Sequence, residues 1–357
     1  MLRGLGIAAL IGLGAGLALW GADTYLGRPE SPPGTPETAL DSLNARYAPF
    51  SVQHPHPFYG FFFPLSPGER AALSNETITL TPEGFRGAGP EARGGRKLAF
   101  LVGGSVAFGF SSSDSTTITG YLNRLQDEYH FVGAGVPSWN TSQSMLRTVV
   151  ELLPYEPALV VLWGGYNDAA QAHTWAQRGQ PFPAGTYESF DAVHGLYAGD
   201  LRRAPDLSLF EQWFPRLAKR LRPATPALPF GPAGDAAAAR FRDNMRVTAA
   251  AARGAGAQFL GVFQPILPLH RHAPPDVDLL GRPEFDAFLT AFHERATSPP
   301  PDSSFVDLGR MFDAAFNPVP LHQPGDELNE AIFVDLVHVY EAGNQIIAEA
   351  ILDAMGG

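Results

Sequence analysis

The sequence predicts an α/β fold built on a parallel sheet of about five strands, with helices on both faces of the sheet. Two observations predict it. From Lys97 onward, short apolar runs alternate with segments of helical spacing, and this alternation is typical of βαβ units. The runs are also apolar at nearly every position, as strands buried on both faces are.

The expected strands and helices follow one another along the chain. The strands are KLAFLVGG (97–104), HFVGAG (130–135), PALVVLWGG (157–165), AQFLGVFQPI (257–266) and SSFVDLG (303–309). The segments with helical spacing are 116–128, 142–153, 236–253 and 340–355. Because parallel strands need a crossover connection, each helix is expected to return the chain to the same end of the sheet.

Residues 1–27 are expected to form a membrane anchor or signal segment. Arg3 precedes the 19 uncharged residues 4–22, which as a helix would span roughly 28 Å, enough for a bilayer core. We favour an uncleaved anchor over a cleaved signal peptide, because the run exceeds a usual apolar signal core and no A-x-A site precedes Asp23. Either interpretation places the rest of the chain outside the cytoplasm, in the periplasm or at the cell surface.

The remaining chain divides by composition. Residues 28–39 have the Pro, Gly, Ser and Thr content of a linker. Residues 40–96 are an irregular extension rich in aromatic residues and proline, where FYGFFFP (58–64) is interpreted as a hydrophobic strand or packing segment. The α/β domain is expected over 97–357, interrupted by a Pro-rich insertion at 170–234.

Composition argues against several classes of function. The net charge is −11 and no basic block occurs, so nucleic acid is not an expected partner. Cysteine is absent, which excludes disulfides, thiolate metal sites and a cysteine nucleophile. His54 and His56 have no third ligand in view, and His270 and His272 are expected to be solvated on a Pro-rich loop, so no metal is expected. The first glycine loop lacks both nucleotide-binding patterns, so no nucleotide cofactor is expected either.

Four polar loops lie where an open α/β sheet binds ligands. Three follow strands, beyond their carboxyl ends, and the fourth precedes the last helix. They read GGSVAFG (103–109), GAGVPSWNTS (133–142), GGYND (164–168) and DLVHVYEAGN (335–344).

Together these loops contain the parts that serine acylation needs. Ser105 opens a helix at a strand end, where backbone N–H groups favour an anion. His338, with Asp335 three residues before it, supplies a base and the carboxylate that orients it. Asn167 offers an amide, and backbone N–H groups near 135–138 offer another donor for an oxyanion. Each feature alone is more often structural, such as a turn serine or a helix cap, but their order and placement together indicate acyl chemistry.

The three blocks resemble those of the SGNH hydrolases, the GDSL-type esterase superfamily. Residues 103–105 are similar to its Gly-Asp-Ser block, with Gly104 in place of the usual aspartate. GYND (165–168) matches its Gly-x-Asn-Asp block, and DLVH (335–338) matches its Asp-x-x-His block. The segment EGFRG (83–87) also resembles one that precedes the serine block in some bacterial members.

The resemblance covers about residues 79–350 and departs from the family in its second block. There the family has a glycine whose N–H completes the oxyanion hole, and by spacing that position is Ser138 rather than Gly135. Because the donor is main chain, a serine serves if it adopts the required backbone conformation. The second donor therefore depends on the backbone at Ser138.

The resemblance implies a flavodoxin-like three-layer α/β/α fold and a set of catalytic roles. Ser105 would attack an acyl carbonyl, His338 would take its proton, and Asp335 would orient His338. The N–H of Ser105, the N–H near Ser138 and the side chain of Asn167 would bind the oxyanion.

We therefore expect a serine esterase that hydrolyses short O-acyl esters of a carbohydrate or an envelope component. Two alternatives remain open. An O-acyltransferase would use the same triad, and the Pro-rich insertion would then exclude water. A non-catalytic binding protein on this scaffold is the other, and Gly104 and Ser138 keep it open.

Overall fold

Five parallel strands form the central sheet of the computed structural model, which describes residues 46–52, 54–56, 58–64, 66–177, 230–273, 283–322 and 331–356. In chain order they are β3 (Lys97–Val102), β4 (Tyr129–Gly133), β5 (Leu159–Gly164), β6 (Gln258–Phe263) and β7 (Phe305–Asp307). The order across the sheet is β4-β3-β5-β6-β7, and every neighbouring pair is parallel. Four strands lie within a predicted apolar run and β4 begins one residue before its run, so the predicted sheet is confirmed.

Successive residues of the strands point into two separate cores. In β3, Phe100 and Val102 join one cluster of buried side chains, whereas Leu101 joins the other. The same alternation separates Leu162 from Val161 in β5. Both faces of the strands are therefore apolar, which is why the sequence shows continuous hydrophobic runs instead of an alternating pattern.

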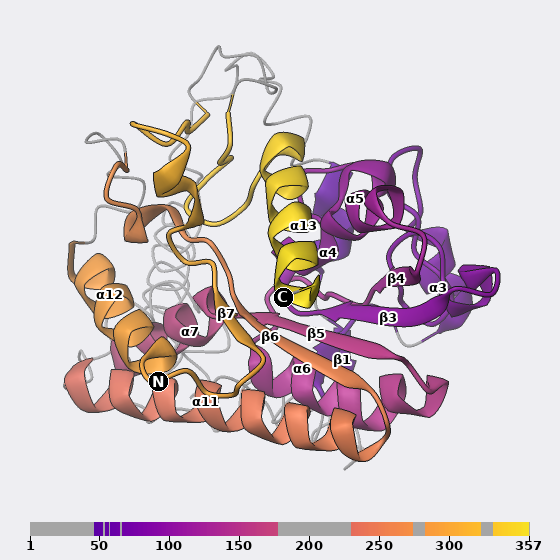
Figure 1. The fold of residues 1–357 in the computed structure, drawn as a ribbon, viewed down its shortest axis with the longest axis horizontal. Helices are drawn as coiled ribbons and strands as arrows, with labels where there is room; N and C mark the ends of the chain where they lie inside the picture. Colours follow the sequence, from indigo (N-terminus) through magenta and orange to yellow (C-terminus); the bar gives the residue numbers. More distant parts are fainter. Residues whose placement is uncertain are drawn as a thin grey trace, which may run out of the picture. The chain divides into compact units, whose positions relative to one another are not determined.

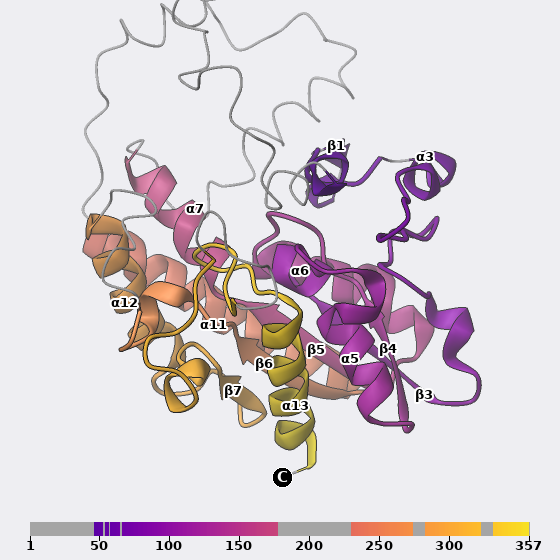
Figure 2. The same cartoon turned by 90° about the horizontal axis from the view of Figure 1, so that it is seen from above.

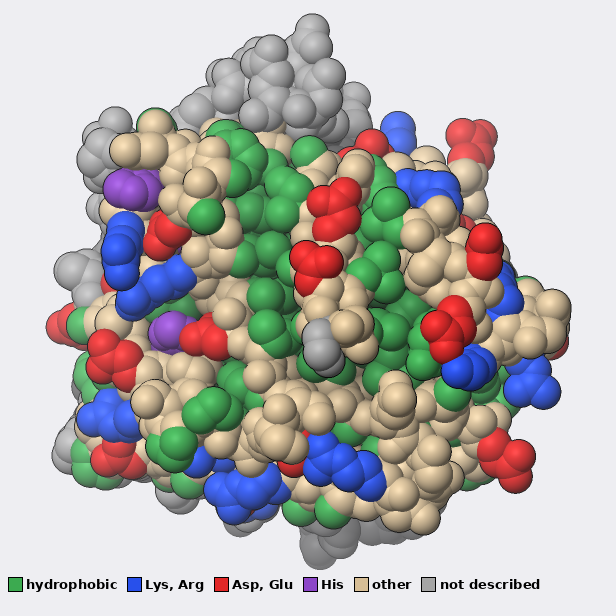
Figure 3. Space-filling view, viewed as in Figure 1, with side chains coloured by type: hydrophobic (Ala, Val, Ile, Leu, Met, Phe, Trp, Pro, Cys, Tyr) green, Lys and Arg blue, Asp and Glu red, His purple; other side chains and the backbone are tan. Residues whose placement is uncertain are grey.

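Helices cover both faces of the sheet (Figures 1 and 2). One side carries α6 (Thr141–Arg147), α7 (Tyr166–Gln177), α11 (Phe230–Gly254) and α12 (Pro283–Thr297). On the other side lie α5 (Ile118–Leu125) and α13 (Glu341–Gly356), which pack together. Figure 3 views this second side, where hydrophobic side chains gather around the centre of the face. The flavodoxin-like three-layer α/β/α arrangement is thus confirmed.

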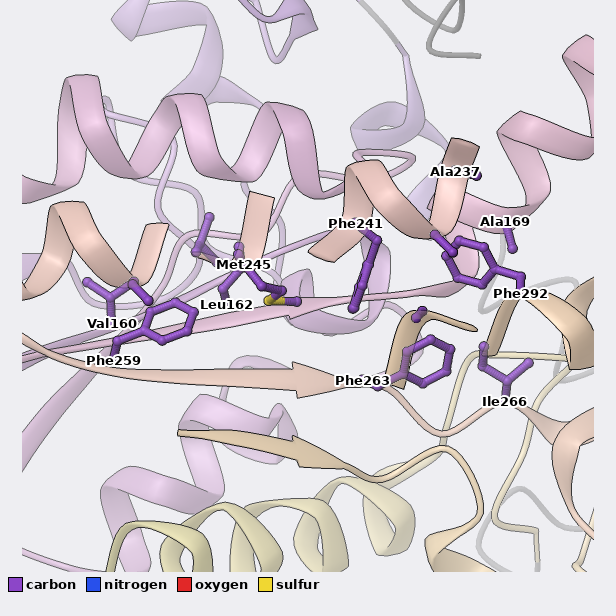
Figure 4. Close-up of a cluster of buried hydrophobic side chains, with 14 of the residues drawn as sticks. Val160, Leu162, Ala169, Ala237, Phe241, Met245, Phe259, Phe263, Ile266 and Phe292 are labelled. Carbon is purple, nitrogen blue, oxygen red and sulfur yellow. The ribbon is translucent and has the colours of Figure 1, made fainter. Parts of the chain in front are cut away.

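The largest core lies between the sheet and α11. Figure 4 shows Phe241 and Met245 of this helix above Leu162, Phe259 and Phe263 of the strands. All five side chains are at most 4% exposed. Burying a side chain of this kind stabilises a fold by about 1.5–3 kcal/mol. Helix α7 contributes Ala169, Ala172 and Ala176 to the same cluster, so this core also holds α7 in position.

The helices agree with the predicted segments in part. Segments 116–128, 236–253 and 340–355 correspond to α5, α11 and α13. Segment 142–153 is α6 followed by a π-helical turn, Thr148–Leu152. Helices α7 and α12 were not among the predicted segments. The buried residues of α7 share one face, but this face includes the polar Asp168 and His173, so no clear apolar stripe marks the helix in the sequence.

The N-terminal extension contains a small hairpin that packs on the main domain. Strands β1 (His54–His56) and β2 (Gly60–Phe62) pair antiparallel, and α3 (Pro67–Ala72) follows. The extension forms an aromatic cluster against Phe108, in the short helix after β3, and Trp139, in the loop after β4. The 3-10 helices of the described chain are Ala48–Ser51, Pro90–Arg93, Asp114–Thr116, Leu153–Tyr155, Leu267–Leu269 and Met311–Ala314. The segment FYGFFFP is therefore a packing segment, as interpreted.

Several expectations fall outside the described residues. These are the anchor (1–27), the linker (28–39) and most of the insertion (170–234). The described ends of that insertion are helical, since α7 extends to Gln177 and α11 begins at Phe230. Among the helices that the structure describes, none is long and apolar enough to cross a membrane.

Candidate active site

The candidate site lies where the chain changes direction across the sheet. From β3 the chain passes to β4 on one side and then returns to β5 on the other side of β3. In open α/β sheets, ligands bind at this switch point, outside the carboxyl ends of the strands. Ser105 follows β3 and Asn167 follows β5, so the topology brings these two residues to the same crevice.

Ser105 is the first residue of the short helix α4 (Ser105–Phe108). The turn before it requires a glycine, because a β-carbon at Gly103 would lie 2.7 Å from the carbonyl oxygen of Trp163 in β5. Gly104 has an extended backbone and caps the helix. The strand and the helix therefore meet in a tight turn that leaves Ser105 partly exposed.

Ser105, His338 and Asp335 form a continuous hydrogen-bonded chain. Nε2 of His338 lies 2.7 Å from Oγ of Ser105, 233 residues earlier in the sequence. Nδ1 of His338 lies 2.7 Å from Oδ2 of Asp335. The other carboxylate oxygen accepts the backbone N–H groups of Val337 at 2.9 Å and His338 at 2.8 Å. Val334 N donates to His338 O at 2.8 Å and closes this loop.

The charge of the site is concentrated on Asp335. Burial acts to raise the pKa of Asp335, but the neighbouring His338 and the backbone N–H groups of the loop outweigh it and hold this pKa below its usual value. Burial, reinforced by the negative charge of Asp335, raises the pKa of both Tyr166 and Tyr340 to about 12. The carboxylate is therefore ionised at neutral pH, while both phenols keep their protons.

Asn167 lies beside the nucleophile turn. Its amide Nδ2 donates to the carbonyl oxygen of Trp139 at 2.8 Å. A β-carbon on Gly104 would lie 2.6 Å from the same Nδ2 atom. The amide is thus positioned against the residue that precedes Ser105, where an amide donor for an oxyanion is expected.

Ser138 has a left-handed backbone, with φ of 68°. Its carbonyl oxygen accepts the side-chain amide of Gln171 at 2.8 Å, and the side-chain amide of Asn140 donates to the same Gln171 at 2.7 Å. Gly135 serves a different purpose, because a β-carbon there would lie 2.3 Å from Phe108 N in α4. Glycine is thus required at position 135 by its close packing on α4. At position 138 a serine adopts the left-handed conformation that favours glycine.

Asp168, the last residue of the GYND motif, is a structural partner of the site. It is 1% exposed and accepts Thr141 N at 3.2 Å and Thr141 Oγ1 at 2.5 Å, with Gly165 N at 3.3 Å. Asn244 of α11 also donates to Thr141 Oγ1, at 2.9 Å. Burial raises the pKa of Asp168 to about 6, despite these hydrogen bonds. This buried carboxyl joins the turns after β4 and β5.

Trp163 and His270 are buried side chains. Trp163 is 1% exposed and belongs to the core under the site. The expectation that His270 is solvated is wrong, because it is 4% exposed and its Nδ1 lies 3.0 Å from the carbonyl oxygen of Ile266. Among the described residues, no three or more histidine, aspartate or glutamate side chains gather in a way that could hold a metal ion.

One further contact and one capping motif were missed. The Phe110 ring lies 4.5 Å from the His338 ring, centroid to centroid, and no sequence spacing predicts this contact. Asn140 and Gln143 form a capping box at the start of α6. That motif is visible in the sequence as a cap residue followed three positions later by Gln.

A serine in the turn at the switch point, with a histidine and a carboxylate in line, is the arrangement of serine hydrolases on an α/β sheet. The model of the GDSL-like Lipase/Acylhydrolase family matches residues 101–346, and the chain belongs to this family. The resemblance drawn from the motifs is thereby confirmed. The chain is a serine hydrolase that acts on carboxylic ester bonds.

Solved structures with a similar arrangement are distant in sequence. The acetyl xylan esterase AlAXEase is 15% identical, with 72% of this chain and 98% of that chain covered and a TM-score of 0.36. TesA is 16% identical, with 72% and 98% covered and a TM-score of 0.40. The acetylxylan esterase Axe2 from Geobacillus stearothermophilus is 13% identical, with 73% and 94% covered and a TM-score of 0.39. No curated protein matches the sequence.

Proposed function

We propose that the chain hydrolyses short O-acyl esters through an acyl-enzyme on Ser105. The observation that carries the proposal is the hydrogen-bonded chain from Ser105 Oγ through His338 to Asp335, with both links at 2.7 Å. A serine is a weak nucleophile unless a base takes its proton, and an imidazole needs a carboxylate to fix its tautomer. Both requirements are met by residues that the fold brings together from distant segments.

In the first half of the reaction, Oγ of Ser105 attacks the acyl carbonyl while Nε2 of His338 takes the hydroxyl proton. The tetrahedral oxyanion then collapses, the bond to the alcohol breaks, and His338 gives its proton to the leaving alcohol oxygen. In the second half, water loses a proton to His338 and attacks the acyl-serine. The carboxylic acid leaves and Ser105 recovers its proton.

Three donors are proposed to bind the oxyanion: the N–H of Ser105, the N–H of Ser138 and the amide of Asn167. The contact of Asn167 with Gly104 supports the third donor, and the left-handed backbone of Ser138 is the conformation that a glycine would adopt there. In the apo state Asn167 donates to Trp139 O. Such hydrogen bonds often realign only in the substrate complex.

The place of action and the alcohol part of the substrate are inferred from the sequence. The uncharged residues 4–22 support a membrane anchor, which would hold the domain outside the cytoplasm. We propose an acylated carbohydrate or another envelope component as the substrate. Protease accessibility of the domain in intact cells tests this location.

The activity is tested with full-length protein in detergent. p-Nitrophenyl acetate, butyrate and octanoate report the acyl preference, and a fluorophosphonate probe followed by mass spectrometry identifies the nucleophile. We expect acetate to be hydrolysed fastest and the adduct to fall on Ser105, with both lost in Ser105→Ala. A folded protein without adduct or hydrolysis would refute the proposal and favour a binding protein. Formation of an acylated sugar in place of free acid would identify the transferase alternative.

A further inference from the structure

Arg86, in the EGFRG segment, places a buried positive charge beneath the loop that follows the nucleophile helix. The side chain is 1% exposed and pairs with Asp114. Its Nη2 donates to Ser112 O at 2.7 Å, and its Nη1 donates to Phe108 O at 3.3 Å, with Gly109 O at 3.5 Å. One planar guanidinium therefore holds carbonyl groups on both sides of Phe110.

The loop needs such support because of its backbone. Gly109 has φ of 84° and Ser111 has φ of 75°, so left-handed residues flank Phe110 on both sides. A left-handed serine is strained and persists only where the surroundings enforce it. The hydrogen bonds from Arg86 are part of those surroundings.

The residue held between these two turns contacts the catalytic base. The rings of Phe110 and His338 are 4.5 Å apart and inclined by 36°. On the same loop, Phe110 N donates to Ser105 O at 2.9 Å. Tyr47 packs on Phe110 at 4.5 Å and donates its hydroxyl to Ser112 O at 2.5 Å. The loop is thus a physical link between Arg86 and the imidazole.

We propose that Arg86 is a positioning residue for catalysis, which fixes the imidazole of His338 by holding Phe110 against it. The inference rests on the proposed function of Ser105 and His338. Arg86 is itself anchored to the sheet, because Arg86 N donates to Gly133 O at the end of β4 at 2.8 Å. The pathway therefore runs from the sheet, through the guanidinium and Phe110, to the base.

The chain offers a matched control in Arg147, a second arginine that is fully buried. Its hydrogen bonds go to the carbonyl oxygens of Glu83, Gly84 and Ala134 and to the carboxylate of Glu151. Loss of either arginine should destabilise the fold, because each substitution leaves buried carbonyl groups without a hydrogen-bond donor. Only the loss of Arg86 removes support from Phe110.

The first measurement compares Arg86→Lys, Arg86→Met and Arg147→Met in full-length protein with p-nitrophenyl acetate. We expect kcat to fall by about 10²-fold in Arg86→Met, the scale expected for misplacement of a catalytic group by about 1 Å, with little change in KM. Arg86→Lys should recover stability but not kcat, since an ammonium pairs with Asp114 but does not span the three carbonyls. Arg147→Met should lose stability while kcat stays near the wild-type value.

The second measurement is a double-mutant cycle between Arg86→Lys and Phe110→Ala. If Arg86 acts through Phe110, the double variant should be no slower than the slower single variant. The third is the downfield proton resonance of His338 Nδ1–H, which does not depend on turnover. It should broaden in both Arg86→Lys and Phe110→Ala and stay sharp in Arg147→Met.

The outcomes separate this inference from the proposed function. Hydrolysis that survives Ser105→Ala would refute the proposed function. If Ser105→Ala is inactive but the effects of Arg86→Lys and Phe110→Ala on kcat multiply, only the positioning role is refuted. It is also refuted if the Nδ1–H resonance is unchanged in Arg86→Lys, or if that variant raises KM alone. If Arg86→Met does not fold, the lysine variant and Phe110→Ala still decide the question.

Discussion

The amide of Asn167 occupies the space that a side chain at Gly104 would need. A β-carbon at Gly104 would lie 2.6 Å from Asn167 Nδ2 and 2.9 Å from Trp139 O, and contacts below 3 Å force a displacement. The usual aspartate of the family therefore does not fit this turn unless Asn167 moves. The position of the Asn167 amide in this chain therefore depends on glycine at position 104.

Substitution of Gly104 should consequently reduce activity through Asn167. We expect Gly104→Ala to lower kcat by about 10²–10³-fold, the scale of losing one oxyanion donor, because the new β-carbon displaces the amide. Gly231→Ala is the matched control, since a β-carbon there meets no other atom within 4 Å. Steady-state kinetics with p-nitrophenyl acetate measures the effect. A Gly104→Ala variant with wild-type kcat would contradict the assigned position of the donor.

Ser138 should tolerate glycine but not a β-branched residue. Its φ of 68° is the left-handed conformation that glycine adopts without strain. We expect Ser138→Gly to keep kcat and to stay within about 1 kcal/mol of the wild-type free energy of unfolding, because relief of strain offsets the added chain entropy. Ser138→Val should lose about 1–3 kcal/mol and lower kcat. Urea denaturation and kinetics on both variants test this, and equal behaviour of the two would rule out a left-handed backbone at this position.

Asp335→Asn should leave the fold intact and lower kcat by about 10³–10⁴-fold. The amide oxygen of Asn can still accept the N–H groups of Val337 and His338, but its NH₂ group would face Nδ1 of His338 and favour the wrong tautomer. Asp313→Asn is a suitable control, because that carboxylate accepts the backbone N–H of Arg271 at 3.0 Å away from the triad. Comparable losses in both variants would show that the effect is not specific to the triad.

Asp168 should make the stability depend on pH between about 4 and 6. Burial raises its folded-state pKa from 3.8 to about 6, so the folded state favours the protonated carboxyl. The stabilisation that the protonated Asp168 carboxyl contributes to the folded state is therefore complete below pH 4 and is lost as the pH rises through 6. We expect the free energy of unfolding, relative to Asp168→Asn, to fall by of the order of 3 kcal/mol from pH 4 to pH 7. Urea denaturation at pH 4, 5.5 and 7 measures the difference, and a constant difference would contradict the raised pKa.

Much of the fold was predictable from local patterns. The apolar runs around Phe100, Val161 and Val262 are uninterrupted because both faces of the sheet are covered, so the strands and their parallel pairing could be recognised in the sequence. Helix α7 was not recognised, because its buried face includes the polar residues Asp168 and His173 and therefore shows no clear apolar stripe. Its first turn nevertheless carries Asn167, whose motif identified the residue without its helix.

By itself, the sequence determined the fold class and the family and singled out Ser105, His338 and Asp335 as candidates, because short motifs need only local spacing to be recognised. Tertiary structure alone decided which groups meet. The hydrogen bond between Ser105 and His338, 233 positions apart, the approach of Asn167 to Gly104 and the contact of Phe110 with the imidazole depend on how the sheet is ordered. The left-handed backbone of Ser138 and the position of the Arg86 guanidinium beneath the Phe110 loop are likewise set by packing and hydrogen bonds between distant segments. Local spacing in the sequence does not encode these contacts.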